Sequence, residues 1–141
     1  MIDIPYPEFV ETISEFLRIP TPTISSDTSG FSKTQIAEAD IANNKIRIKT
    51  CADERDTYFA IAHELRHFWQ SRHGFDFDSH ESNKSVSANR YNSQEEEIDA
   101  NAFGVIVMSE FGVRPLFTNL DEPNKKLIYD RADEIAKYSI F

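Results

Sequence analysis

The sequence contains a single cysteine, Cys51, so a disulfide within the chain is impossible. Its 4 glycines and 6 prolines are too few for a collagen-like or low-complexity chain. No apolar run approaches the roughly 18 residues that a membrane helix requires; the best candidates, Tyr58–Ala62 and Gly104–Met108, are far shorter. The first residues show neither the basic nor the apolar segment of a signal peptide. We therefore expect one cytoplasmic domain over residues 1–141 that does not enter a membrane.

Basic residues are also scarce. The chain has 15 Lys and Arg against 24 Asp and Glu, which gives a net charge of -9. A protein that holds nucleic acid through its phosphates concentrates Lys and Arg. Here they are scattered, and Lys125-Lys126 is the only adjacent pair. The composition therefore disfavours a nucleic-acid partner.

Apolar residues recur at helical spacing in four segments. These segments are residues 7–18, 53–72, 94–111 and 122–138. The first is expected to bury one face, made of Phe9, Val10, Ile13, Phe16 and Leu17. A capping box, Ser93-Gln94-Glu95-Glu96, favours a helix start at the third segment, and Asp121 is a suitable cap for the fourth.

A small sheet is expected before the second helix. Residues 45–49 alternate strictly between polar and apolar side chains, as a strand with one buried face does. Asn43-Asn44 suits a tight turn, and residues 35–41 are the candidate partner strand. Residues 20–30 are expected to form an exposed loop, and the polar residues 75–93 a long loop or lid. The prediction is an α+β fold with about four helices and a small antiparallel sheet or hairpin.

The informative motif is His63-Glu64-Leu65-Arg66-His67. Residues i and i+4 share one face of a helix, so the two imidazoles can converge on one metal ion. Glu64 is rotated away from that line and can reach a water held by the ion, which is the arrangement of a hydrolytic HExxH site. The alternative is a surface helix that carries two histidines, and the charge of Arg66 within the motif favours it.

A catalytic zinc needs a third protein ligand. His73 has the spacing of the metzincin motif, but Gln70 occupies the glycine position that turns the chain there. If the helix continues, His73 lies about 15 Å beyond His63. The other candidate is Glu97, whose i+4 neighbour Asn101 can bond the outer nitrogen of a ligand imidazole.

Residues 60–67 together with Glu97-Ile-Asp-Ala-Asn-Ala-Phe-Gly resemble the two signature helices of the ImmA/IrrE-type metallopeptidases, and the hairpin suits that family's sheet. The resemblance covers about residues 34–110. It implies a zincin-like fold, zinc bound by His63, His67 and Glu97, Glu64 as general base, and Asn101 behind the ligands. It also implies that the substrate is a protein, such as a repressor or another regulator.

The chain departs from the family pattern at three places. Arg66 is charged, Asp99 replaces the usual Glu, and Met108 is followed by Ser109 instead of Pro. These departures bear on activity and substrate more than on zinc binding.

Hydrolysis also needs a donor for the developing oxyanion. The first candidate is Tyr91 and the second His80; Arg90 and His73 lie nearby in the sequence. The sequence thus favours a zinc-dependent metalloendopeptidase acting on a protein or peptide. The alternatives are a non-catalytic binding module on the same scaffold and a metzincin-like site that uses His73.

Overall fold

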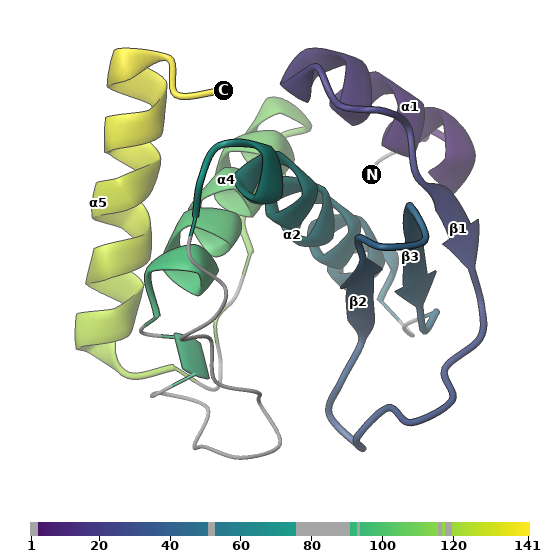
Figure 1. Cartoon of the computed structure of the whole chain (residues 1–141). Coiled ribbons are helices and arrows are strands. Elements are labelled where there is room, and N and C mark those ends of the chain that lie inside the picture. The colour runs from purple at the N-terminus through teal and green to yellow at the C-terminus, as the bar shows by residue number, and fades with distance from the viewer. Residues whose placement is uncertain (1–2, 51–52, 76–90, 93, 116, 118–119) are drawn as a thin grey trace.

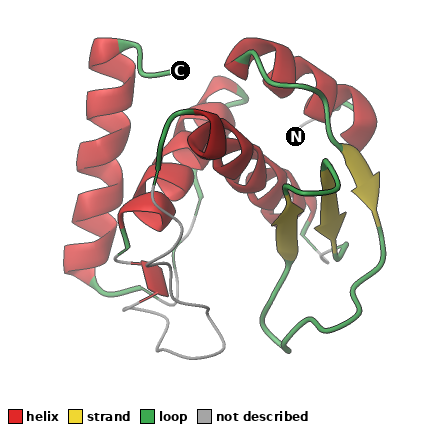
Figure 2. Ribbon diagram, in the orientation of Figure 1, coloured by secondary structure: helices red, strands yellow, loops and turns green. Residues whose placement is uncertain are grey.

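A computed structural model describes residues 3–50, 53–75, 91–92, 94–115, 117 and 120–141. Within these ranges the protein is α+β, with four helices and one three-stranded sheet (Figures 1 and 2). The elements are α1 (Tyr6–Leu17), β1 (Thr23–Ser25), β2 (Ala37–Asp40), β3 (Lys45–Ile48), α2 (Glu54–Arg72), α4 (Glu95–Glu110) and α5 (Glu122–Tyr138). Among the described residues, no helix is both long and apolar enough to cross a membrane.

The four predicted helices are confirmed, each to within one residue at either end. The Asp121 side chain caps α5 by accepting a hydrogen bond from the backbone N–H of Asn124 at 3.0 Å. The cap of α4 lies one residue later than the capping box predicted. Its N-cap residue is Gln94, whose carbonyl accepts from the backbone N–H of Ile98. Ser93 lies outside the described residues, as do Cys51 and most of the expected loop or lid, residues 76–90.

One apolar side chain is not where the helical spacing placed it. Phe16 is 52% exposed and contacts the ring of Phe141. It lies off the centre of the apolar stripe of α1. In α1 the buried face consists of Phe9, Val10, Ile13 and Leu17, together with Ser14.

The sheet is mixed and not purely antiparallel, which corrects the prediction. The hairpin of β2 and β3 is confirmed, with Ala37 opposite Ile48 and Asn44 in the left-handed turn conformation. β1, however, was expected to be part of an exposed loop and instead pairs in parallel with β3. A strand of three residues is too short to show an alternating pattern in the sequence. Its partner strand is brought close only by the tertiary fold.

Helix α2 lies at the centre of the molecule (Figure 1). It contacts β2, β3 and α1, and it also packs along α4, which in turn contacts α5. Gly104 allows α2 and α4 to approach closely, since a Cβ at this position would lie 2.6 Å from the ring of Phe59. The second half of α2, with its two histidines, therefore faces the first turns of α4.

Candidate metal centre

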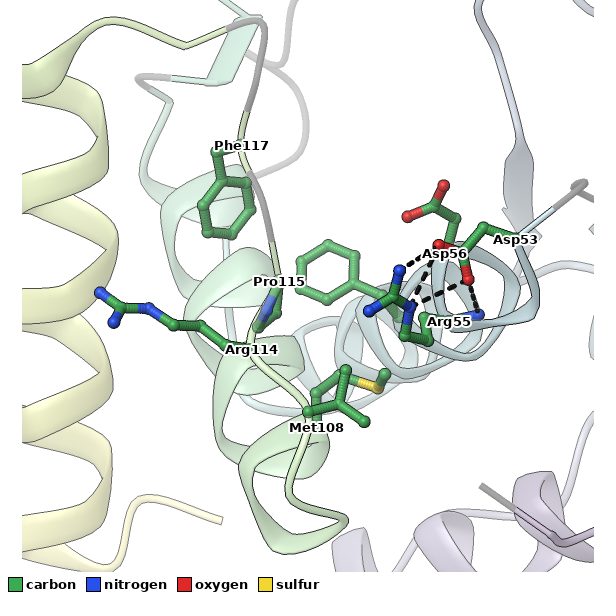
Figure 3. A pocket seen from close by; sticks show the side chains of 9 residues that line it. Asp53, Arg55, Asp56, Met108, Arg114, Pro115 and Phe117 are labelled. Carbon is green, nitrogen blue, oxygen red and sulfur yellow. Dashed lines mark hydrogen bonds and ion pairs between the residues drawn. The ribbon is translucent and has the colours of Figure 1, made fainter. Parts of the chain in front are cut away.

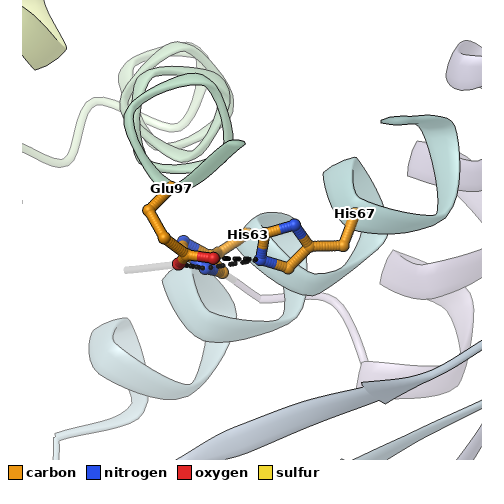
Figure 4. Close-up of side chains that lie close together, drawn as sticks. All are labelled: His63, His67 and Glu97. Carbon is orange, nitrogen blue, oxygen red and sulfur yellow. Dashed lines mark hydrogen bonds and ion pairs between the residues drawn. The ribbon is translucent and has the colours of Figure 1, made fainter. Parts of the chain in front are cut away.

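His63 and His67 project from α2 toward Glu97, in the first turn of α4 (Figure 4). The Nε2 atom of His63 lies 3.0 Å from Oε1 of Glu97, and Nε2 of His67 lies 3.1 Å from Oε2 of the same carboxylate. The two Nε2 atoms are 3.1 Å apart. The structure therefore brings together the three residues that the sequence proposed as ligands.

The spacing of these atoms suits a small divalent cation. Three tetrahedral zinc ligands, each 2.0–2.1 Å from the ion, lie about 3.3 Å from one another. The nitrogen and oxygen distances of 3.0–3.1 Å come close to that value. Two imidazoles and one carboxylate also match the His2Glu set of catalytic zinc sites, so the residues fit the metal.

The outer nitrogens of both imidazoles contact amide oxygens. Nδ1 of His63 lies 2.7 Å from Oδ1 of Asn101, the contact expected from the i+4 spacing of Glu97 and Asn101. Nδ1 of His67 lies 2.7 Å from Oε1 of Gln70. An amide oxygen accepts only, so each Nδ1 carries the proton and donates it. In the neutral rings, the Nε2 atom of each imidazole then carries the lone pair that a metal would use.

Burial and neighbouring charges shift the pKa values of the residues in this cluster. Glu97 is fully buried, which by itself raises the pKa of its carboxyl, but the imidazoles of His67 and His63 hold that pKa well below its usual range. Burial also works against a charged His67, yet Glu97, Glu64 and Gln70 together raise the pKa of His67 to about 10. The buried Glu97 carboxylate thus needs a positive charge beside it. A proton on His67 supplies that charge when no metal is bound, and a divalent cation would replace the proton.

Glu64 lies beside the three candidate ligand residues. Its Oε1 atom lies 3.9 Å from Nε2 of His63, farther than the ligand atoms lie from one another. Glu64 is only 9% exposed, and this burial raises the pKa of its carboxyl. A carboxylate of raised pKa next to a water site is suited to accept a proton.

Tyr91 faces the same space. A cavity of about 220 Å³ separates α2 from the start of β2 and is lined by His63, Glu64, Tyr91 and Glu97, among others. Burial, together with the nearby carboxylates of Glu97 and Glu64, raises the pKa of the Tyr91 hydroxyl, so the hydroxyl keeps its proton. The first candidate for the oxyanion donor is thus close to the candidate metal ligands.

His73 is not part of the cluster. It forms the C-cap of α2, where its ring stacks on Trp69 at a centroid distance of 4.1 Å and its Nδ1 lies 2.8 Å from the Trp69 carbonyl oxygen. Because α2 continues to Arg72, His73 is about 15 Å along the axis from His63. The metzincin-like arrangement therefore lacks its third ligand. His80 and Arg90 lie outside the described residues.

Arg66 has a role that the sequence did not indicate. α2 is not a surface helix, because the Arg66 side chain is 0% exposed. Its guanidinium donates to Asp99 through Nε at 2.8 Å and Nη2 at 3.2 Å. Arg66 and Asp99 are two of the three departures from the family pattern, and here they neutralise one another. The sequence did contain one signal for this contact, since Arg66 and Asp99 carry opposite charges.

A second, smaller hollow adjoins the cavity (Figure 3). Its volume is about 100 Å³, and it lies between the first turns of α2 and the segment after α4. It shares Asp56 and Phe59 with the larger cavity. Arg55, on its wall, is neutralised by a bidentate hydrogen bond to Asp53. Asp56 and Phe59 therefore form a wall common to the two hollows.

The sequence resemblance rests on two short helical motifs, and both motifs contribute residues to this cluster. The i, i+4 spacing on each helix accounts for the pairs His63 with His67 and Glu97 with Asn101, and the contact between the two pairs comes from the packing of α2 against α4. Comparison of the chain with protein-family models, with curated proteins and with solved structures gives no match.

Proposed function

We propose that this protein is a zinc-dependent metallopeptidase that hydrolyses peptide bonds in a protein substrate. The observation that supports it best is the convergence of His63, His67 and Glu97 at 3.0–3.1 Å, with a buried Glu64 facing the same cavity. This set combines three metal ligands with one carboxylate that is left over for proton transfer. By the resemblance, the substrate would be a regulatory protein.

Zinc, when bound, supplies a Lewis acid that polarises a carbonyl group and makes a water molecule more acidic. Within the chain, Glu64 is the general base: its carboxylate takes a proton from the attacking water and passes it to the leaving amine nitrogen as the C–N bond breaks. Because Glu64 is only 9% exposed, little bulk water competes for its carboxylate.

Tyr91 is the proposed donor to the oxyanion. Its hydroxyl remains protonated because burial raises its pKa, and it lines the cavity with Glu64. From the cavity wall the hydroxyl can donate to the carbonyl oxygen of the substrate and so stabilise the developing charge.

The test compares the wild type with Glu64→Gln, using zinc content and cleavage of a mixture of quenched-fluorescence peptides. We expect the variant to hold zinc like the wild type and to cleave on the order of 10²–10⁴-fold more slowly. Asp56→Asn is the matched control, since it also replaces a carboxylate by an amide on the wall of the same cavity. Cleavage by Glu64→Gln at the wild-type rate would reject the general-base role.

A hydroxamate peptide separates the enzyme from a non-catalytic binding module. A catalytic zinc keeps an open coordination position that a hydroxamate can occupy, whereas a closed structural zinc does not. Hydroxamate binding to the zinc-loaded protein supports the peptidase. Zinc without hydroxamate binding and without cleavage would favour the binding module.

A further inference from the structure

Gln70 is fully buried and lies three residues after His67, on the same face of α2. Its side-chain amide makes three short contacts. The oxygen Oε1 lies 2.7 Å from Nδ1 of His67, and the nitrogen Nε2 donates to the Glu96 carbonyl and to Oδ2 of Asp99, both at 2.8 Å. The amide oxygen thus accepts one hydrogen bond, and the amide nitrogen donates two.

These contacts allow the amide only one orientation. If it turned over, its nitrogen would face the Nδ1–H of His67, and its oxygen would face two other oxygens, those of Glu96 and Asp99. All three hydrogen bonds would be lost in a buried place where water cannot replace them. The Gln70 oxygen thus always faces His67.

Asp99 is itself held firmly from two helices. Its carboxylate accepts from Arg66 of α2, from Gln70 and from Arg131 of α5. Arg66 also donates to the backbone carbonyl of Ile140 at 2.9 Å, and its guanidinium lies 3.6 Å above the ring of Trp69. The acceptor that orients Gln70 is therefore part of the contact between α2, α4, α5 and the end of the chain.

We propose that Gln70, held by Asp99 and the Glu96 carbonyl, is a positioning residue that fixes the ring of His67 with its Nε2 lone pair facing the metal. This inference rests on the proposed function only in that it takes His67 to be a metal ligand. Gln70 does not touch the metal or the substrate. It acts by accepting the Nδ1 proton, which sets both the orientation of the ring and the nitrogen that remains free.

The test measures metal binding by wild type and Gln70→Met, a variant of similar size in which a weakly accepting thioether replaces the amide oxygen that faces His67. We expect the zinc dissociation constant, measured against a chromophoric chelator, to rise 10- to 100-fold. We also expect the visible absorption of the Co²⁺-loaded protein to change, because the imidazole no longer has a fixed direction. Asn124→Leu is the matched control, since it removes a buried amide on α5, away from His67.

A purely structural role for Gln70 predicts a different pattern. Gln70→Met would then lower the unfolding temperature of the metal-free protein as Asn124→Leu does, while the zinc dissociation constant and the Co²⁺ spectrum stay at their wild-type values. That result would overturn the inference and leave the proposed function intact. A wild-type protein that binds neither Zn²⁺ nor Co²⁺ would overturn both.

A second measurement, made on the wild type, decides the question if Gln70→Met does not fold. We expect nitrogen NMR of the zinc-loaded protein to show the His67 ring proton on Nδ1 and protected from exchange with water, because the buried Gln70 oxygen accepts it. A ring proton on Nε2, or an Nδ1 proton that exchanges as fast as that of an exposed histidine, would overturn the acceptor role.

Discussion

The two imidazoles of the candidate metal centre are held in different ways. His67 is backed by Gln70, Asp99 and Arg66, which are at most 1% exposed and include a buried ion pair. His63 lies at the cavity and is backed by Asn101, whose amide nitrogen in turn donates to Asn92 at 3.2 Å. One ring is thus anchored by charge in the core, and the other by neutral amides near the cavity.

The two environments predict different effects of substitutions on folding stability and on metal affinity. The groups behind His67 also join α2 to α4 and α5, so a change there should cost folding free energy as well as metal affinity. The groups behind His63 hold α4 and the residues just before it, so a change there should act chiefly on the metal. The following variants test that division.

Glu97→Ala should have the largest effect, because its carboxylate contacts both rings. We expect about one zinc per chain in the wild type and almost none in the variant, since two neutral imidazoles alone do not make a catalytic zinc site. Elemental analysis of the purified proteins measures this. His73→Ala is the control and should keep its zinc; zinc loss there and retention in Glu97→Ala would assign the third ligand to His73.

Asp99→Asn should cost about 3–5 kcal/mol of unfolding free energy, because it leaves Arg66 buried without its counter-charge. Urea denaturation of the metal-free protein measures this. Asp133→Asn, at an exposed position of α5, is the control and should change the free energy by no more than about 0.5 kcal/mol. Equal stability of the two variants would mean that the ion pair does not join the helices.

Asn101→Ala removes the acceptor behind His63. We expect zinc affinity to fall about tenfold, because the ring loses the contact that orients it. The unfolding free energy of the metal-free protein should fall by only about 1 kcal/mol, the value of one hydrogen bond. Chelator competition and urea denaturation on the same sample measure both quantities. A stability loss as large as that of Asp99→Asn would contradict the division between the two rings.

Asp121→Ala should have the smallest effect. It removes the side-chain cap of α5 and should lower the unfolding free energy by about 1 kcal/mol. Zinc affinity should not change, since the cap lies at the opposite end of α5 from the contact between Arg66 and Ile140. A drop in zinc affinity would contradict this expectation, because it would mean that the start of α5 also affects the candidate metal ligands.

Several features of the protein follow from local sequence. The helix bounds were predictable because local signals act within a few residues: the apolar spacing, the cap Asp121, and Gly74 and Gly112, which directly follow the C-cap residues of α2 and α4 in the left-handed conformation. The convergence of His63 with His67, and of Glu97 with Asn101, follows from i, i+4 spacing alone. Whether the two pairs would face each other did not follow from that spacing, and the prediction that they do is confirmed.

The pairing of β1 and the exposure of Phe16 could not be predicted from local sequence. β1 pairs with β3 across some 20 residues, and no pattern within Thr23–Ser25 announces this pairing. Phe16 has an apolar side chain at helical spacing, yet the helix turns it outward. In both cases the deciding partner lies elsewhere in the chain.

The sequence by itself determined the helices, the hairpin and the chemical types of the candidate metal ligands, because each depends on residues only a few positions apart. Only the tertiary structure decided that Arg66 pairs with Asp99, that the Gln70 amide faces His67 with its oxygen, and that Tyr91 lines the same cavity as Glu97. The physical reason is burial. A charge or an amide enclosed by three helices must satisfy its hydrogen bonds with whatever the packing brings near it, and that packing is a property of the whole chain.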